Sequence, residues 1–205
     1  KSRDDKFEFI DSPIKGDFFQ GTMYDASRKM MYLLTGQGNG FGAYDVKNKK
    51  LLRYDMMGSI PHIGVIDNSG AVWGTYGVER HAFCKYIPEK NDYVFPEKCY
   101  VPDGTEASNK MYVGAGPIDS AIKANNGMLY FGTALGALLE LNPTTYEVKY
   151  LGKPFPGIRM PGLALDKDGN VLMCGGSDGA PYVARFDIVN RTISSLGQVI
   201  AEDGT

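Results

Sequence analysis

A hairpin that recurs four times along the chain is the feature that most constrains how this sequence can fold. Each copy has apolar residues, a polar turn and a second apolar strand, as in GVIDNSGAVWGTY at residues 64–76. The four copies occupy residues 23–35, 64–76, 122–134 and 164–176. A further strand, turn and strand follows each copy, at residues 42–55, 84–97, 139–152 and 184–197. Each unit therefore predicts two hairpins, which together make four short antiparallel strands.

The spacing of the copies predicts a particular architecture. A large apolar residue marks the middle of the second strand in each copy, and these markers are Tyr32, Trp73, Tyr130 and Leu172. Subtracting their numbers gives intervals of 41, 57 and 42 residues. A period of about 40 to 45 residues with four short strands per unit is typical of a β-propeller blade. The long middle interval predicts an insertion between the second and third units.

We therefore predict an all-β chain that forms a β-propeller of four-stranded antiparallel blades. About four complete blades are expected, at residues 17–57, 58–100, 117–156 and 157–200, with the insertion at residues 101–116. Residues 1–16 resemble the outer strand of a preceding blade. We expect a ring of roughly six to eight blades, completed by missing blades or by another chain. The alternative is a β-sandwich or barrel, but a sandwich has no reason to repeat the same hairpin at this period.

The balance of charges argues against two classes of partner. The chain has 22 basic and 24 acidic residues, so it lacks the positive excess that attracts nucleic acids or anionic membranes. No apolar run approaches the roughly 18 to 20 residues that a membrane-spanning helix needs. We therefore expect a soluble chain that has neither nucleic acid nor a membrane as its partner.

The cysteines and the start of the chain bear on its compartment. Cys84, Cys99 and Cys174 show no C-x-x-C spacing, which disfavours a structural zinc site and c-type haem. The chain begins at Lys1, with neither Met nor a signal peptide. This start fits a mature secreted protein, a trimmed chain or a fragment. Among these, we favour an extracytoplasmic or secreted location.

A glycine-rich stretch, TGQGNGFGAYD at residues 35–45, fits the G-x-G-x-x-G/A spacing of dinucleotide-binding turns. In those turns a helix follows, and its N-terminus binds the pyrophosphate. Here the residues after the glycines predict a hairpin instead, so we expect no nucleotide and interpret the glycines as a tight turn with positive φ. The stretch DKDGN at residues 166–170 is likewise interpreted as a hairpin turn, because it lacks the distant Glu of a calcium loop.

The last repeat carries a resemblance to a known superfamily. The pattern in PGLALDKDGNVLMCGG at residues 161–176 is a proline and glycine lead, an inner strand, Asp-x-x-Gly and a second strand. This pattern resembles the blades of the streptogramin lyase, gluconolactonase and NHL-type propellers. The resemblance implies the propeller fold. It leaves the activity open, because that superfamily contains hydrolases, lyases and binding modules, and we find no match to the metal-binding Glu and Asn pattern of gluconolactonases.

The start of each inner strand is the expected place for a site. Aligning the four inner strands puts Gln20, His62, Asp119 and Pro161 in equivalent positions at one end of the channel. Three of these four residues are polar, which a closed set of apolar strands would not require. Loops at this end converge on the channel mouth, where a rigid scaffold displays its ligand contacts.

Several polar residues at this mouth are candidates for function. His62 is the candidate general base or ligand of a divalent cation, and a hydrogen-bonded channel histidine is the alternative. Asp119 is a candidate to bind a cation or a sugar hydroxyl, or else to cap backbone amides. Arg159 is a candidate carboxylate clamp or a surface residue. The turn between the second and third strands of the second unit adds three more ligand-binding candidates, Glu79, Arg80 and His81, of which His81 is expected to be solvated.

Three functions follow from these residues. The first is a binding module that recognises a small molecule, a saccharide or a protein partner at the channel mouth, with aromatic side chains for stacking or for packing. The aromatic candidates are Tyr24, Trp73, Tyr76, Tyr112 and Tyr182. The alternative is a lyase or a metal-assisted hydrolase that uses His62 as base or metal ligand. The third is a purely structural interaction subunit.

Overall fold

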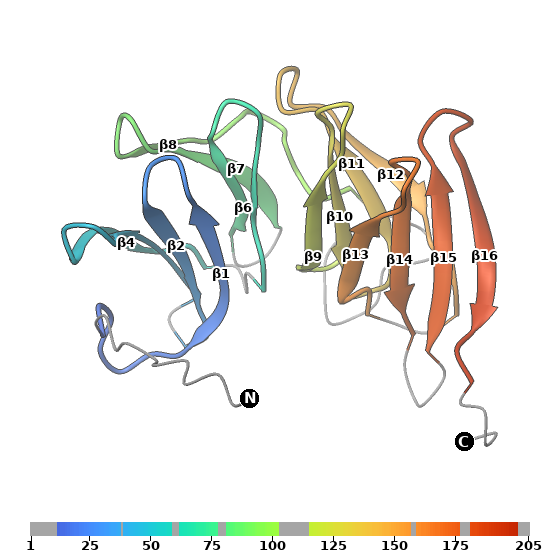
Figure 1. Ribbon diagram of the computed structural model, residues 1–205, viewed down its shortest axis with the longest axis horizontal. Coiled ribbons are helices and arrows are strands. Elements are labelled where there is room, and N and C mark those ends of the chain that lie inside the picture. The colour runs from blue at the N-terminus through green and yellow to red at the C-terminus, as the bar shows by residue number, and fades with distance from the viewer. Residues whose placement is uncertain are drawn as a thin grey trace, which may run out of the picture.

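The computed structural model describes residues 12–37, 39–58, 62–77, 81–102, 115–156, 159–176 and 181–200. These residues form four antiparallel sheets, each with four strands in sequential order, and no helix occurs among them. The sheets fan out side by side in chain order (Figure 1). The predicted all-β fold with four-stranded blades is confirmed. Within the described ranges, no helix is long and apolar enough to cross a bilayer.

Each blade is a meander of four strands. The first blade contains β1 (Phe19–Asp25), β2 (Met30–Thr35), β3 (Gly40–Asp45) and β4 (Lys50–Met56). The second contains β5 (Val65–Ile66), β6 (Val72–Tyr76), β7 (Ala82–Ile87) and β8 (Asp92–Val94). The third contains β9 (Ile118–Lys123), β10 (Leu129–Thr133), β11 (Leu138–Leu141) and β12 (Val148–Gly152). The fourth contains β13 (Gly162–Leu165), β14 (Val171–Gly175), β15 (Tyr182–Asp187) and β16 (Thr192–Gln198).

The hairpin turn between the first two strands of a blade is closed by an aspartate in three of the four blades. Oδ1 of Asp67 accepts hydrogen bonds from the Ser69 amide at 2.8 Å and from the Ala71 amide at 3.1 Å. Asp25 and Asp166 accept the corresponding amide bonds in the first and fourth blades. Such Asx turns satisfy backbone donors locally. The DKDGN stretch thus forms the hairpin turn that its pattern predicts.

Buried aromatic side chains join neighbouring blades face to face. Tyr32, Trp73 and Tyr130 are each fully buried, so these markers of the repeat are packing residues. Tyr32 packs with Phe41 of its own blade and with Tyr86 of the second blade. Trp73 belongs to the core cluster between the second and third blades, and Tyr130 to the cluster between the third and fourth. Burial of side chains of this size is the main term that holds the blades together.

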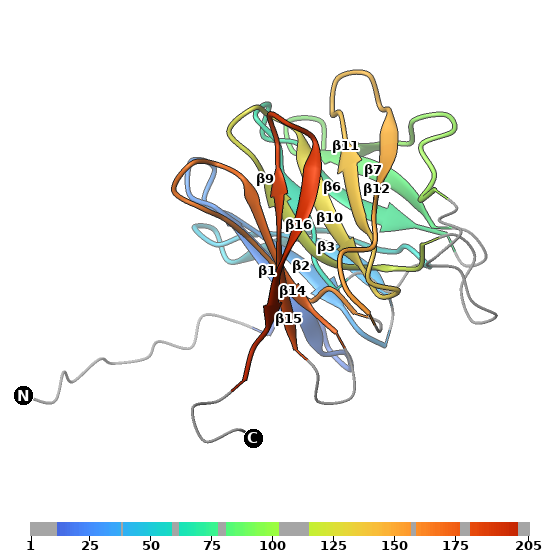
Figure 2. The ribbon, with the colours of Figure 1, turned by 90° about the vertical axis from the view of Figure 1, so that its right-hand side faces the viewer.

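The four inner strands are arranged as an arc. β1 contacts β5, β5 contacts β9, and β9 contacts β13. The first and fourth blades lie at opposite ends of this arc, and the side view shows the hairpins of successive blades fanned around a common direction (Figures 1 and 2). Because each inner strand begins at the same end of its blade, the residues that precede or open these strands meet at that end.

Two predicted segments fall mainly outside the described residues. Residues 1–11 of the expected outer strand (1–16) lie outside, and residues 12–16 form a turn whose Ile14 packs on the outer face of the first blade with Leu33 and Tyr44. Residues 103–114 of the insertion also lie outside. Its two ends are described: Val101 and Ala115 are both fully buried at the base of the insertion.

The glycine-rich stretch is a connection between two strands, but the reason for its glycines differs from the prediction. Gly40 opens β3, and the positive φ of the described part of this turn belongs to Asn39, at 42°. Gly36 and Gly40 are needed for close approach instead. A side chain at Gly36 would collide with the Phe18 ring, and one at Gly40 with the Tyr54 ring.

Candidate functional site

The site begins with a β-bulge in the inner strand of the third blade. β9 pairs with β10 on both sides of Asp119, but the register shifts there and leaves Asp119 as an extra residue. β1 of the first blade shows the same shift at Gln20. A bulge bends its strand and re-aims the side chain of the extra residue. The equivalence of Gln20 and Asp119 predicted from the alignment therefore rests on a shared backbone feature.

The side chains of these two residues have different surroundings. Gln20 is exposed, whereas the Asp119 side chain is only 1% exposed. A carboxylate this deeply buried requires a positive partner or several donors, since burying an unpaired charge costs several kcal/mol. Asp119 has such a partner in the connection that leads into the next blade.

Arg159 is that partner. Its Nε donates to Oδ2 of Asp119, and its Nη2 donates to Oδ1 at 2.9 Å. The two bonds make a bidentate pair, which fixes the plane of the guanidinium as well as its position. The Arg159 side chain nevertheless remains 48% exposed. A guanidinium has five N–H donors, so those not bound to Asp119 are available at the surface.

The backbone of Arg159 is held in an uncommon conformation. Its φ is 73°, in the left-handed region that a residue other than glycine seldom adopts. The Arg159 amide donates to the Ala134 carbonyl at 3.0 Å, and its carbonyl accepts from the Gly176 amide at 3.1 Å. Loops of two blades thus bind this residue from both sides. Strained residues that are held this firmly occur preferentially at functional sites.

His62 completes the group. It lies three residues before β5, and its Nε2 is 4.0 Å from Oδ1 of Asp119. This separation is too long for a hydrogen bond but short enough for Asp119 to attract a protonated imidazole. The His62 side chain is 33% exposed. Its carbonyl lies against Gly21 of β1, where any side chain would collide with it.

Three of the predicted residues thus converge from three blades. The second blade contributes His62, the third Asp119, and the connection into the fourth Arg159. We name these three residues the mouth site. The sequence predicts the residue types and their common end of the channel, but it does not predict that Asp119 is the buried link between the two others.

Ser120 is a neighbour that the sequence pattern did not single out. Its hydroxyl is buried and donates to the Met160 carbonyl at 2.5 Å. The bond ties the bulge of β9 to the segment that carries Arg159. Gly132 lies opposite, and a side chain there would collide with both Ser120 and Met160. In the sequence, Ser120 is visible only as the serine that directly follows Asp119. A serine at such a position does not differ from other polar residues of a strand.

The three candidates in the second-unit turn have different outcomes. Glu79 and Arg80 lie outside the described residues. His81 is described, and the expectation that it is solvated is wrong: it is 6% exposed. Its carbonyl accepts a hydrogen bond from the Val101 amide at 2.9 Å, so the segment near residue 101 packs over the start of β7. Burial lowers the pKa of His81 below its ordinary value.

A divalent cation does not fit the mouth site. Both oxygens of Asp119 accept hydrogen bonds from the Arg159 guanidinium, and a cation would have to displace or approach that positive group. Among the residues that the structure describes, no group of three or more His, Cys, Asp or Glu is placed to hold a metal ion.

Comparison with known proteins defines the class of fold. No family model and no curated protein sequence matches the chain. Among solved structures, a catalytically inactive variant of virginiamycin B lyase from Staphylococcus aureus, in complex with quinupristin, is similar with a TM-score of 0.63 and 17% identity. The match covers 90% of this chain and 56% of that one.

Two further structures show the same fold. A streptogramin B lyase matches with a TM-score of 0.62 and 11% identity, over 90% of this chain and 55% of the lyase. A protein assigned as a gluconolactonase matches with a TM-score of 0.58 and 14% identity, over 91% of this chain and 68% of that one. The chain thus spans little more than half the length of the lyases. At these identities the predicted resemblance to this propeller superfamily is confirmed for the fold.

Proposed function

We propose that this propeller binds a small ligand with a carboxylate group at the channel mouth. Arg159 binds the carboxylate, and His62 contacts the part of the ligand next to it. The observation that carries this proposal is Arg159 itself: its backbone has a positive φ, and the buried Asp119 holds its half-exposed guanidinium in one orientation. A group fixed before the ligand arrives loses little conformational entropy on binding.

The choice of a carboxylate follows from the donors that remain. Arg159 has planar N–H donors left after its pair with Asp119, and a planar carboxylate matches them. His62 adds a partly exposed imidazole within 4.0 Å of the same aspartate. When the ligand carboxylate is bound to Arg159, His62 would face the neighbouring part of the ligand. That part is either a hydroxyl group, which His62 can hydrogen-bond, or a C–H bond.

Isothermal titration calorimetry with a matched pair of ligands tests this proposal. D-gluconate carries the carboxylate, and D-sorbitol replaces it with a neutral alcohol. We expect D-gluconate to bind at least about tenfold more tightly than D-sorbitol, and Arg159→Ala to remove most of that difference. Arg53→Ala is the matched control, because Arg53 is a partly exposed arginine on β4 that also pairs with an aspartate, Asp55. Equal binding of both ligands to the native protein would contradict the proposal.

A lyase is the second candidate, and the proximity of His62 to the Asp119–Arg159 pair favours it. In an elimination next to a carboxylate, His62 would accept the α-proton while the C–H electrons form a double bond. The bond to the leaving oxygen then breaks, and that oxygen keeps its electron pair and takes a proton from solvent. Arg159 would stabilise the enolate-like charge that develops on the carboxylate.

The two candidates differ in what His62→Ala would do. Quinupristin, the compound bound in the similar lyase variant, is a suitable trial substrate. Consumption of quinupristin by the native protein, followed by chromatography and lost in His62→Ala, would support the lyase. Retention of D-gluconate binding together with no consumption of quinupristin would support the binding module.

A further inference from the structure

A polar pocket lies at the opposite end of the blades from the mouth site. It is formed where the second and third blades meet, by the β5–β6, β9–β10 and β11–β12 turns. Its volume is about 650 Å³, within the range of small-molecule sites. Asp119 opens β9 and Asn126 follows its other end, so at about 3.3 Å per residue the two regions are separated by roughly 20 Å. We name this cavity the turn pocket.

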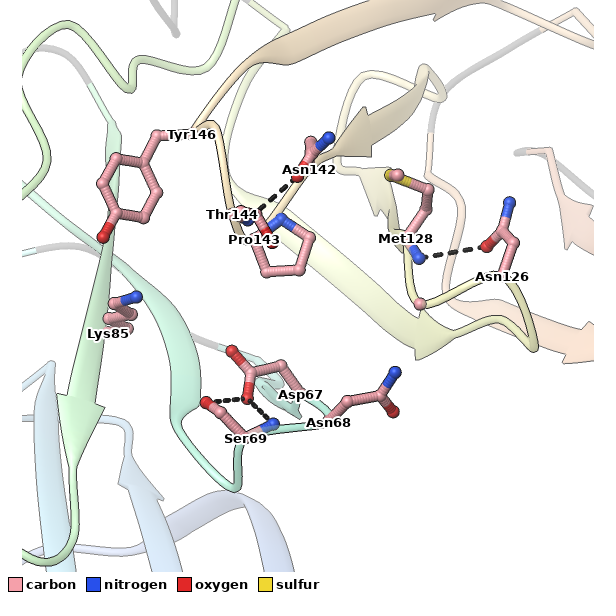
Figure 3. A pocket seen from close by; sticks show the side chains of 11 residues that line it. Asp67, Asn68, Ser69, Lys85, Asn126, Met128, Asn142, Pro143, Thr144 and Tyr146 are labelled. Carbon is pink, nitrogen blue, oxygen red and sulfur yellow. Dashed lines mark hydrogen bonds between the residues drawn. The ribbon is translucent and has the colours of Figure 1, made fainter.

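Figure 3 shows how the side chains of the turn pocket face one another. Lys85 and Tyr146 lie on one side, and Asn126 and Met128 lie across from them. The lining combines apolar residues with uncharged polar ones, which are Asn, Ser and Thr side chains. The residues of this kind are Asn68, Ser69, Asn126, Asn142 and Thr144.

Lys85 supplies the positive charge of this pocket. Its ammonium nitrogen lies 5.3 Å from the centre of the Trp73 ring and 4.8 Å from that of Tyr146. Among the described residues no carboxylate lies within ion-pair distance of it, so the two rings are its only stabilising neighbours of this kind. Cation–π contacts hold the ammonium in place but leave its N–H donors without strong acceptors. An acceptor from a ligand would satisfy them.

The junction of the third and fourth blades has a charged residue, Glu140, at the position that matches Lys85, and there the charge is paired within the protein. Glu140 of the third blade faces Tyr130 across its strands, as Lys85 faces Trp73 in the second. Glu140 is neutralised by Arg191 of the fourth blade, whose turn position matches that of Tyr146. The junction at Lys85 has an aromatic ring where its counterpart has an opposite charge. Among the described residues, Lys85 therefore has no opposite charge paired with it at its junction.

Two side-chain amides of the turn pocket also have donors that no described residue accepts. Oδ1 of Asn142 accepts the amides of Thr144 and Thr145, which turns its NH₂ group away from the backbone. Within the described part of the chain neither that NH₂ group nor the Asn68 side chain has a hydrogen-bond partner. Such amide donors suit hydroxyl groups.

Asp67 is the carboxylate among the described lining residues, and its oxygens are already occupied. Oδ1 accepts hydrogen bonds from Ser69, and Oδ2 accepts one from Trp73 Nε1 at 2.8 Å. The side chain is buried. Its role is to close the hairpin turn, so Lys85 is the charge that an entering ligand would meet.

We propose that the turn pocket binds an acidic saccharide, with Lys85 contacting the carboxylate and the Asn68 and Asn142 amides contacting ring hydroxyls. One ammonium among neutral donors matches a single negative charge on a hydroxyl-rich molecule. A doubly charged phosphate would require several cations or a cluster of backbone amides. The proposal does not depend on the mouth site, because the two sites share no residue.

Titration by calorimetry with methyl α-D-glucuronoside, and with methyl α-D-glucoside as its neutral match, tests the turn pocket. We expect Lys85→Met to weaken binding of the glucuronoside about tenfold or more, and Asn142→Ala to weaken it about threefold. Lys50→Met, at an exposed lysine of β4, is the control and should change nothing. Circular dichroism of each variant shows whether it is folded.

Four results would overturn the proposal. The first is equal binding of the glucuronoside to native protein and to folded Lys85→Met. The second is a glucuronoside affinity that falls in Arg159→Ala instead, which would place the ligand at the mouth site. The third is equal binding of the neutral glucoside. The fourth is displacement by inorganic phosphate at equal concentration, which would indicate a general anion site. Loss of D-gluconate binding in Arg159→Ala together with normal glucuronoside binding would support a turn pocket that is separate from the mouth site.

Discussion

Two carboxylate–arginine pairs connect the third and fourth blades, and they differ in what surrounds them. Asp119 pairs with Arg159 at the channel mouth, and Glu140 pairs with Arg191 near the other end. Both pairs are bidentate, and both arginines have positive φ. The chemistry of the pair alone therefore does not distinguish a functional site from a structural one.

The remaining neighbours make the distinction. Oε2 of Glu140 also accepts a hydrogen bond from the buried Tyr130 hydroxyl at 2.8 Å, and Arg191 lies over the Phe186 ring. The Glu140 carboxylate is thus buried among packing residues, while Arg191 remains 43% exposed. Burial acts to raise the pKa of Glu140, but the bonds from Arg191 and Tyr130 outweigh it, so that pKa lies below its ordinary value. The Asp119 pair instead borders a partly exposed histidine, which is a group that can react or bind.

The largest expected effect is on stability, at the Glu140–Arg191 pair. Glu140→Ala leaves Arg191 without its partner and a buried Tyr130 hydroxyl without its acceptor. We expect the free energy of unfolding to fall by about 3 kcal/mol, measured by urea denaturation. Glu147→Ala is the control, because Glu147 is 59% exposed and pairs only with exposed Lys149. It should change stability by less than about 0.5 kcal/mol. Similar losses for both variants would contradict the structural role of Glu140.

The second prediction concerns ligand binding at the mouth pair. Asp119→Asn keeps the shape of the side chain but removes the charge that orients Arg159. We expect the affinity for D-gluconate to fall about tenfold, because the guanidinium is no longer held in one position. Glu140→Gln is the matched change at the other pair and should leave that affinity unaltered. Equal affinities in native protein and in folded Asp119→Asn would remove the distinction between the two pairs.

The smallest expected effect is on the pH dependence of stability, at the buried His81. Burial lowers the pKa of His81, so below the ordinary histidine pKa of 6.5 the unfolded chain binds a proton that the folded chain does not. Stability should therefore decrease as the pH falls through the range below 6.5. His81→Gln should flatten that part of the curve of stability against pH, measured by urea denaturation at a series of pH values. An unchanged curve in folded His81→Gln would contradict the burial of this histidine.

The sequence predicts the fold well because the blade pattern is local. The aspartate turn at Asp67 and the buried marker Trp73 lie within one hairpin. The residues that determine the structure of a repeat are therefore close together in the sequence. The link between Asp119 and Arg159 is different in kind. It spans 40 residues and depends on a bulge and on a backbone conformation that neither residue type indicates. The His81 backbone likewise bonds to a distant residue, Val101, and no local pattern predicted that this histidine is buried.

The most direct test of the mouth site is the NMR signal of His62 during a titration with D-gluconate. The chain has two histidines, so His62→Gln and His81→Gln assign both imidazole signals. If Arg159 holds the ligand carboxylate beside His62, the His62 signal should shift in the native protein and stay constant in Arg159→Ala. A His62 signal that does not respond, or that responds equally in Arg159→Ala, would contradict a shared site of His62, Asp119 and Arg159.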